Sequence, residues 1–185
     1  MVENKKAILE AREASEHQLT CLYEEYYSKV ARYIFARIGD QTEAEDLASE
    51  VFVKALDSLK NYQERGLPMQ AWLFKIAHNL VVDHLRKISR QKAVPIEDLK
   101  VPDDSDPVEE AEAHLEMERV NRAMQSLTED QREVIRLRFM AELTSKEVSQ
   151  VLNKSDGAVR EMQRASLEKL RNILKESGTL GQGNG

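Results

Sequence analysis

The chain is poor in the residues on which disulfides and metal sites depend. Its single cysteine, Cys21, cannot form an internal disulfide, and the apolar residues around it predict that it is buried. The four histidines do not suit zinc, because His78 and His84 stand six positions apart on one expected helix and so diverge, while His17 and His114 fall in different domains. We therefore expect no metal centre.

Glycine-rich and long apolar segments are also missing. With 7 glycines the chain has no glycine-rich phosphate loop, and its carboxylates fall on expected helix faces or in a linker. No apolar run approaches the roughly 18 residues of a membrane span, and the N-terminus has no signal-peptide core. These absences predict a cytoplasmic protein with no direct membrane insertion, no enzymatic activity, no cofactor and no small-molecule substrate.

The charge balance is acidic overall but basic in one segment. The net charge is −6, which predicts weak attraction of the free chain for duplex DNA. Residues 73–92 nevertheless contain five Lys or Arg and one Asp, a local net charge of +4. This contrast favours a protein that binds DNA with the help of a larger platform.

Residues 127–171 have the pattern of a three-helix helix-turn-helix unit. Thr128 precedes Gln131 by three positions and Thr144 precedes Glu147 by three, which is the capping-box spacing at a helix start. Ser155 is a suitable N-cap for a third helix that runs to about residue 174. The predicted inward residues are Val134, Ile135 and Phe139, then Val148, Val151 and Leu152, then Val159, Met162, Ser166, Leu170 and Ile173.

The outward face of the third helix carries arginine and glutamate. In helix-turn-helix proteins this part of the last helix contacts base edges, and its first turn offers N–H groups to phosphate. A solvated charged face would have the same composition, so the DNA-binding interpretation depends on the whole three-helix arrangement. The predicted DNA-reading residues are Ser155, Gly157, Arg160, Glu161 and Arg164.

The N-terminal half predicts two longer amphipathic helices. The first begins at a capping box of Thr42 and Glu45, and the second follows a turn of residues 61–68, where Pro68 suits a helix start. Their inward residues are Ala44, Leu47, Ala48, Val51, Phe52, Ala55, Leu56 and Leu59, then Trp72, Leu73, Ile76, Ala77, Leu80, Val81, Leu85 and Ile88.

A basic strip is predicted on the opposite side of the second of these helices. Side chains of this kind can bond and stack bases while neutralising phosphate charge, although a solvated face remains the alternative. A lone Trp72 is more often a core residue than a base-stacking one. The strip consists of Lys75, Asn79, Asp83, Arg86 and Arg90, with His78, His84 and Lys87 beside them.

Between the two halves, residues 91–107 hold three of the four prolines and an acidic run, and they predict a flexible linker. Seventeen residues at about 3.3 Å each reach about 55 Å. The expected fold is therefore all-α, with two small helical domains at residues 1–90 and 108–177, the linker at 91–107 and a disordered tail at 178–185.

Both halves resemble modules of the extracytoplasmic-function (ECF) sigma factors, the small members of the bacterial sigma-70 family. The C-terminal half is similar to region 4 at Leu127, Gln131, Arg132, Glu133, Val134, Leu137, Arg138, Phe139, Glu147, Val148, Gly157, Ala158, Val159, Arg160, Gln163, Leu167, Leu170 and Arg171. The N-terminal half is similar to region 2 at Glu43, Ala44, Glu45, Asp46, Leu47, Glu50, Val51, Phe52, Trp72, Leu73, Ile76, Ala77, Asn79, Leu80, Asp83, Leu85 and Arg86. Departures occur at Ser49, Ser149, Asn153 and Ala165, where the family more often has Gln, Ala, Gly and Arg.

The resemblance implies an alternative sigma factor that binds RNA polymerase core and directs initiation at specific promoters. Region 4 would hold the upstream promoter element and contact the polymerase flap, and an anti-sigma factor would regulate the protein. The clamp helices of the largest polymerase subunit would bind Glu45, Asp46, Leu47, Glu50, Val51 and Phe52. The downstream element, where the duplex opens, would be held by Asn61, Trp72, Lys75, His78, Asn79, Asp83, Arg86 and Lys87.

Two other functions remain open from the residues alone. A polymerase-independent repressor or activator would bind duplex DNA without core polymerase, and a helical scaffold would bind only proteins. The sequence does not reveal the promoter, the inducing signal or the anti-sigma partner.

Overall fold

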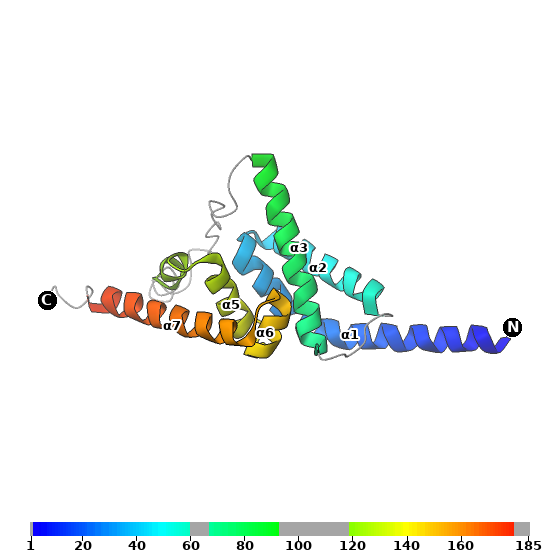
Figure 1. The fold of residues 1–185 in the computed structure, drawn as a ribbon. Helices are drawn as coiled ribbons and strands as arrows, with labels where there is room; N and C mark the ends of the chain where they lie inside the picture. The colour runs from blue at the N-terminus through cyan, green and yellow to red at the C-terminus, as the bar shows by residue number, and fades with distance from the viewer. Residues whose placement is uncertain (1, 60–66, 93–118, 180–185) are drawn as a thin grey trace. The chain divides into compact units, whose positions relative to one another are not determined.

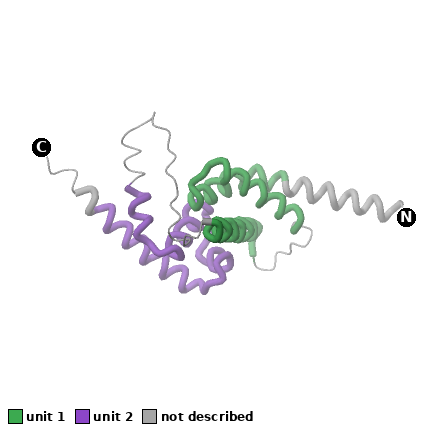
Figure 2. The backbone as a smooth tube through the Cα atoms, turned by 90° about the horizontal axis from the view of Figure 1, so that it is seen from above, with its two compact units in different colours: residues 1–102 green, residues 103–185 purple. Residues whose placement is uncertain are grey.

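The computed structural model describes residues 2–59, 67–92 and 119–179, and within these ranges every regular element is a helix (Figure 1). The chain divides into two compact units, residues 1–102 and 103–185 (Figure 2). Most of the predicted linker, residues 93–107, lies outside the described residues, as do residues 180–185 of the predicted tail. The all-α prediction is confirmed.

Unit 1 is built from three helices: α1 (Val2–Ile38), α2 (Gln41–Leu59) and α3 (Met69–Lys92). Helices α1 and α2 lie side by side, and α3, seen almost end-on in Figure 2, crosses both of them. The core contains Leu22, Val30, Tyr33, Ile34, Ala44, Leu47, Ala48, Val51, Phe52, Ala55, Leu73, Phe74, Ala77 and Val81. This packing positions the outer faces of α2 and α3 for contact with partners.

The centre of unit 1 is an aromatic contact that joins α1 to α3. The rings of Tyr33 and Phe74 are fully buried and meet edge to face, with centroids 5.6 Å apart. Such pairs add about 0.5–1.5 kcal/mol beyond the area they bury. Phe74 was absent from the predicted inward residues, and Trp72, which was among them, is only half-buried.

The predicted capping box of Thr42 and Glu45 is wrong, because α2 begins earlier. Gly39 has a positive φ of 75° and ends α1, so the chain reverses at once. Asp40 then caps α2: its Oδ1 accepts from the backbone N–H of Glu43 at 2.8 Å. The reversal moves the helix start two residues toward the N-terminus.

Unit 2 contains α5 (Glu129–Phe139), α6 (Ser145–Leu152) and α7 (Asp156–Thr179), preceded by helical residues 119–125. Both predicted capping boxes are confirmed. Thr128 Oγ1 accepts from the N–H of Gln131 at 3.3 Å, and Gln131 Oε1 accepts in return at 3.0 Å. Thr144 and Glu147 exchange the same pair of bonds at 3.3 and 2.6 Å.

The turn between α6 and α7 explains one departure from the family pattern. Asn153 has φ 52° and ψ 42°, the left-handed conformation that glycine adopts most easily and that asparagine tolerates. Ser155 then caps α7 as predicted, because its Oγ accepts from the N–H of Ala158 at 3.1 Å. Helix α7 continues to Thr179, beyond the predicted end at Leu174 and into the predicted tail.

Three further predictions need correction. Phe139 is 56% exposed, because it is the last residue of α5 and lies beyond the buried stretch Glu133–Leu137. Cys21 is exposed, since α1 turns the neighbouring Leu22 toward the core instead. Leu56 is also exposed, at the end of the apolar side of α2.

Candidate functional site

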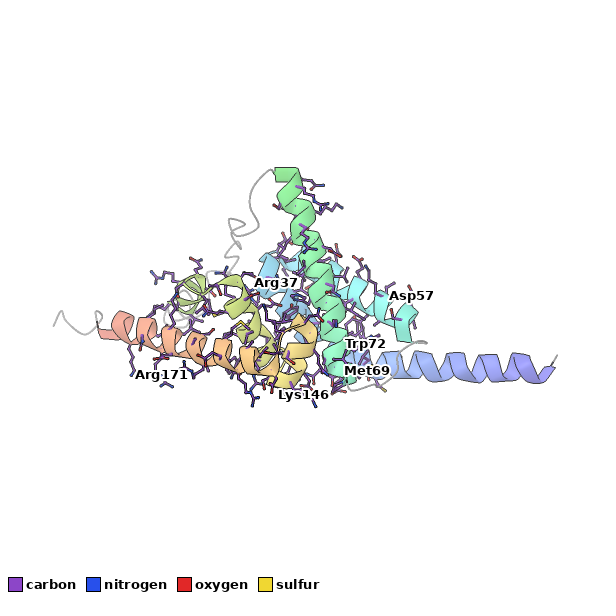
Figure 3. The ribbon with its side chains drawn as sticks, viewed as in Figure 1. Arg37, Asp57, Met69, Trp72, Lys146 and Arg171 are labelled. Atoms are coloured by element: carbon purple, nitrogen blue, oxygen red, sulfur yellow. The ribbon has the colours of Figure 1, made fainter. Side chains whose placement is uncertain are left out.

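The two sides of α7 are the two sides that the sequence predicts. Val159 and Ser166 are fully buried against α5 and α6. The outer side is exposed over about three turns and consists of Arg160, Glu161, Arg164, Glu168 and Arg171. Figure 3 shows the Arg171 side chain projecting from the helix. The predicted reading residues therefore share one accessible face.

The arginines of this face are held by carboxylates of the same helix. Arg160 Nη2 lies 2.7 Å from Asp156 Oδ2. Arg164 donates from Nε and Nη2 to the two oxygens of Glu161 at 3.1 and 2.7 Å, and from Nη1 to Glu168 Oε2 at 3.2 Å. The hydrogen bonds and the charge of Arg164 lower the pKa of Glu161, and Glu161 in turn raises the pKa of Arg164.

Gly157 is in the first turn of α7 and is exposed. A Cβ added there would meet no heavy atom within 4 Å. The packing of the unit therefore does not require glycine at this position. Its lack of a side chain leaves the helix N-terminus open to close approach by a ligand.

Contacts that the sequence did not reveal fix α7 against the rest of unit 2. Arg138 donates from Nε to Gln163 Oε1 at 2.9 Å and from Nη1 to the carbonyl of Leu143. Lys154, in the turn before α7, pairs with Asp130 at 2.8 Å. These bonds connect the first helix of the unit to the helix that carries the reading residues.

A buried charge cluster explains part of the region 4 pattern in α5. Glu133 and Arg136 are both buried, with Arg136 Nη1 3.5 Å from Glu133 Oε2 and 3.3 Å from Glu129 Oε1. Arg132 also pairs with Glu129 and donates to the carbonyl of Leu127. These ion pairs and hydrogen bonds lie within unit 2 and stabilise its packing.

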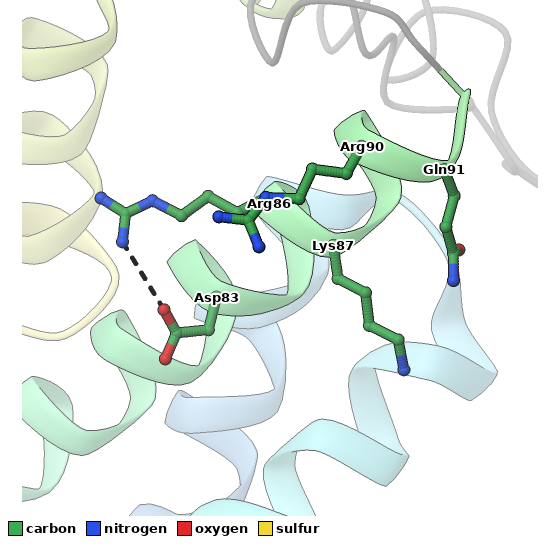
Figure 4. Close-up of a pocket in the computed structure, with 5 residues that line it drawn as sticks. All are labelled: Asp83, Arg86, Lys87, Arg90 and Gln91. Atoms are coloured by element: carbon green, nitrogen blue, oxygen red, sulfur yellow. Dashed lines mark ion pairs between the residues drawn. The ribbon is translucent and has the colours of Figure 1, made fainter.

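The strip predicted on α3 is exposed along much of its length. Asn79, Asp83, Arg86 and Lys87 are exposed, whereas Lys75 is half-buried. Arg86 Nη1 lies 3.6 Å from Asp83 Oδ1, and the two residues line a shallow depression (Figure 4). The depression is lined by Asp83, Arg86, Lys87, Arg90 and Gln91.

The two histidines of α3 contact neighbouring helices. His78 is half-buried, and its Nδ1 lies 3.3 Å from both Tyr33 Oη and Arg37 Nη1 of α1. His84 Nε2 lies 3.1 Å from Glu43 Oε1 of α2. Both side chains therefore hold α3 to the rest of unit 1.

A second depression lies between α2 and α3. Its lining combines the apolar Ile76 and Leu80 with polar side chains from both helices, among them Asn79. Met69 and Trp72 occupy the first turn of α3 (Figure 3). Asn61, which was predicted to bind the downstream element, lies outside the described residues. The complete lining is Lys54, Asp57, Ser58, Ile76, Asn79, Leu80 and Asp83.

The predicted polymerase-binding residues of α2 separate into two sets. Glu45, Asp46 and Glu50 are exposed. Leu47, Val51 and Phe52 are buried in the core, where they support the outer face of α2 from below. Sequence reasoning missed an exposed apolar neighbour, Val53, which is 59% accessible and follows Asp46 and Glu50 at helical spacing.

No helix in the described part of the chain is long and apolar enough to cross a membrane. Within residues 2–59, 67–92 and 119–179, no three His, Cys, Asp or Glu side chains group in a way that could hold a metal ion.

Comparison with known proteins matches both units. The sigma-70 region 2 family matches residues 22–91, and the sigma-70 region 4 family matches residues 123–172. The ECF RNA polymerase sigma factor SigD of Mycobacterium tuberculosis is 32% identical over 155 residues, which cover 80% of this chain and 73% of SigD. The ECF sigma factor BldN of Streptomyces coelicolor is 31% identical over 160 residues, which cover 84% of this chain but 60% of BldN.

A solved structure shows the same fold. The sigma factor RpoE, in complex with the anti-sigma factor NepR from Bartonella quintana, is 20% identical and has a TM-score of 0.67. The match covers 85% of this chain and 97% of RpoE. Together with the two family matches and the SigD relationship, these findings show that the chain belongs to the ECF sigma factors of the sigma-70 family.

Proposed function

We propose that this ECF sigma factor binds the clamp helices of the largest RNA polymerase subunit through the exposed face of α2. The observation that supports this proposal most strongly is the division of α2 into a buried and an exposed side. Asp46, Glu50 and Val53 project from the exposed side, where acidic groups and one apolar group can meet a basic and apolar partner surface. The residues beneath them keep the helix in place.

The downstream promoter element, in this proposal, lies along α3. Arg86 and Lys87 neutralise backbone phosphates, and Asn79 can bond a base edge at the depression between α2 and α3. Extruding a base from the stack costs a few kcal/mol, which binding in such a depression must offset. Ile76 and Leu80 offer the apolar surface for that purpose.

The upstream element is then held by the outer face of α7. The first turn of α7, open at Gly157, suits close approach to a phosphate, and Arg160 and Arg164 face the same direction. The polymerase flap contacts unit 2, and core polymerase supplies affinity that a chain of net charge −6 lacks. The protein acts in the cytoplasm, and an anti-sigma factor regulates it by covering its polymerase-binding face.

The decisive experiment reconstitutes the full chain with bacterial core polymerase on candidate promoters. The wild-type chain is expected to bind core and form open complexes. The double reversal Asp46→Lys and Glu50→Lys removes association with core while circular dichroism shows an unchanged helical fold, because both side chains are exposed. A matched reversal on α1, Glu24→Lys with Glu25→Lys, keeps core binding.

Two outcomes contradict the proposal. Initiation that is unaffected by reversal at Asp46 and Glu50 removes the assigned interface. Tight duplex binding with no requirement for core polymerase indicates an independent transcriptional regulator instead.

A further inference from the structure

The guanidinium of Arg164 is held by two carboxylates in an unequal way. Glu161 makes a bidentate contact with one edge of the guanidinium: Arg164 Nε donates to Oε2 at 3.1 Å, and Arg164 Nη2 donates to Oε1 at 2.7 Å. Glu168 accepts a single bond from Nη1 at 3.2 Å. The two-bond contact fixes the plane of the guanidinium, whereas a single bond leaves it free to rotate.

The bonds leave a definite set of donors for a ligand. Arginine has five N–H groups, and three of those on Arg164 are used by the two carboxylates. One N–H therefore remains on each of the two terminal nitrogens. The O6 and N7 acceptors of guanine in the major groove likewise take two donors from one arginine.

Arg160, one turn earlier, is held differently. Its contact with Asp156 joins one nitrogen to one oxygen, at 2.7 Å. That contact does not fix the plane of the guanidinium, so Arg160 suits a phosphate, which accepts from many directions. Both arginines are exposed, but a two-bond contact fixes the guanidinium plane of Arg164, whereas the single contact of Arg160 does not.

We propose that Arg164 reads a guanine in the upstream promoter element and that Glu161 is the positioning residue that orients it. Both oxygens of Glu161 accept from Arg164, which is the contact that gives Glu161 this orienting role. This inference depends on the proposed role of α7 in upstream-element binding. The pair is solvent-exposed, and its contact is therefore weak enough for Arg164 to adjust as it meets the base.

The test uses holoenzyme reconstituted with the full chain and a promoter library randomised in the upstream element. Bound DNA is sequenced to give the base preference at each position. Arg164→Lys keeps the charge but loses the planar fork, and is expected to reduce guanine preference at one position about tenfold. Glu161→Gln is expected to reduce preference at the same position about threefold and to leave other positions unchanged.

Glu168→Gln is the matched variant, because it removes the same charge beside the same arginine but leaves the two-bond contact intact. It is expected to raise affinity for all sequences a few-fold and to keep the guanine preference. In the Arg164→Lys background, Glu161→Gln is expected to have no further effect on base preference. Glu25→Gln on α1 serves as the remote control.

Four outcomes overturn the inference. The orienting role is excluded if Glu161→Gln and Glu168→Gln change base preference equally, or if Glu161→Gln acts without Arg164. The guanine assignment is excluded if Arg164→Lys alters no guanine position. If the wild-type holoenzyme selects no upstream sequence, the proposed function of α7 is wrong and the inference fails with it.

Discussion

Nε of Arg138, near the end of α5, lies 2.9 Å from Oε1 of Gln163 in α7, although the two residues are 25 positions apart in the chain. Arg138 also donates to the carbonyl of Leu143, so one side chain connects the end of α5, the following turn and α7. The orientation of the reading helix therefore depends on a residue of another helix.

The first prediction concerns this contact. Gln163→Met keeps the side-chain length but removes the acceptor, leaving part of the Arg138 guanidinium unsatisfied. We expect unfolding in urea to show a loss of about 1–2 kcal/mol, and holoenzyme to bind the upstream element more weakly. Asn172→Ala, an exposed change on the same helix, should stay within about 0.5 kcal/mol of wild type. Unchanged stability and binding in Gln163→Met would contradict the assigned role.

A second prediction separates folding from binding at Gly157. Because the added methyl group meets no atom, Gly157→Ala is expected to stabilise the free protein by about 0.4–1 kcal/mol, through reduced freedom of the unfolded chain. The same methyl group should hinder close approach of a phosphate and weaken upstream-element binding. Thermal unfolding and holoenzyme binding measure the two effects. A more stable variant with unchanged DNA binding would show that phosphate does not approach here.

The left-handed turn at Asn153 gives a third prediction. Asn153→Gly should maintain or slightly raise the free energy of unfolding, because glycine adopts this conformation without strain. Asn153→Ala should lower it by about 1 kcal/mol, since a Cβ without a polar side chain is disfavoured there. Equal stability of the two variants in urea would show that the turn relaxes to another conformation.

A fourth prediction tests the two sides of α2. Leu47→Ala is expected to lower the free energy of unfolding by about 2–5 kcal/mol, because it leaves a cavity in the core. Val53→Ala, on the exposed side, should change stability by less than about 0.5 kcal/mol and yet weaken binding to core polymerase. If Val53→Ala lowers stability but leaves binding to core polymerase unchanged, Val53 lies outside the interface.

The fifth prediction is a pH dependence. The hydrogen bonds and the charge of Arg164 lower the pKa of Glu161 in the folded chain below the ordinary value of a glutamate side chain. The stabilisation from this pair is therefore present above the unfolded pKa and is lost as the pH falls through the folded pKa. Carbon NMR of the Glu161 carboxyl should show a midpoint below 4.5, and Arg164→Gln should move it upward. A midpoint that does not respond to Arg164→Gln would show that the pair is absent in solution.

In unit 2, predictions that depended on neighbouring residues in the chain succeeded. The capping boxes at Thr128 and Thr144, and the cap at Ser155, involve partners three positions away, so one turn of helix decides them. The accessible face of α7 followed from helical spacing for the same reason. The two family signatures also fall on local motifs, and they were sufficient to predict the family.

Predictions failed where the outcome depended on packing beyond the helix itself or on a competing cap nearby in the chain. Phe139 continues an apolar pattern, yet it is the last residue of α5, beyond the buried stretch Glu133–Leu137, and it is exposed. Thr42 and Glu45 have capping-box spacing, but the reversal at Gly39 made Asp40 the cap. His78 was predicted beside the basic strip because of its residue type and its position in the helix. Its contacts with Tyr33 and Arg37 instead direct the side chain toward α1.

The amino-acid sequence by itself determined the caps of α5, α6 and α7 and the membership of the sigma-70 family, because each capping motif and each family motif depends on residues within a few positions of one another. Only the tertiary structure decided which side of α2 is available to a partner and which arginine of α7 has a fixed plane. Burial and side-chain orientation are properties of atoms brought together from separate turns and helices, and a linear pattern does not contain them.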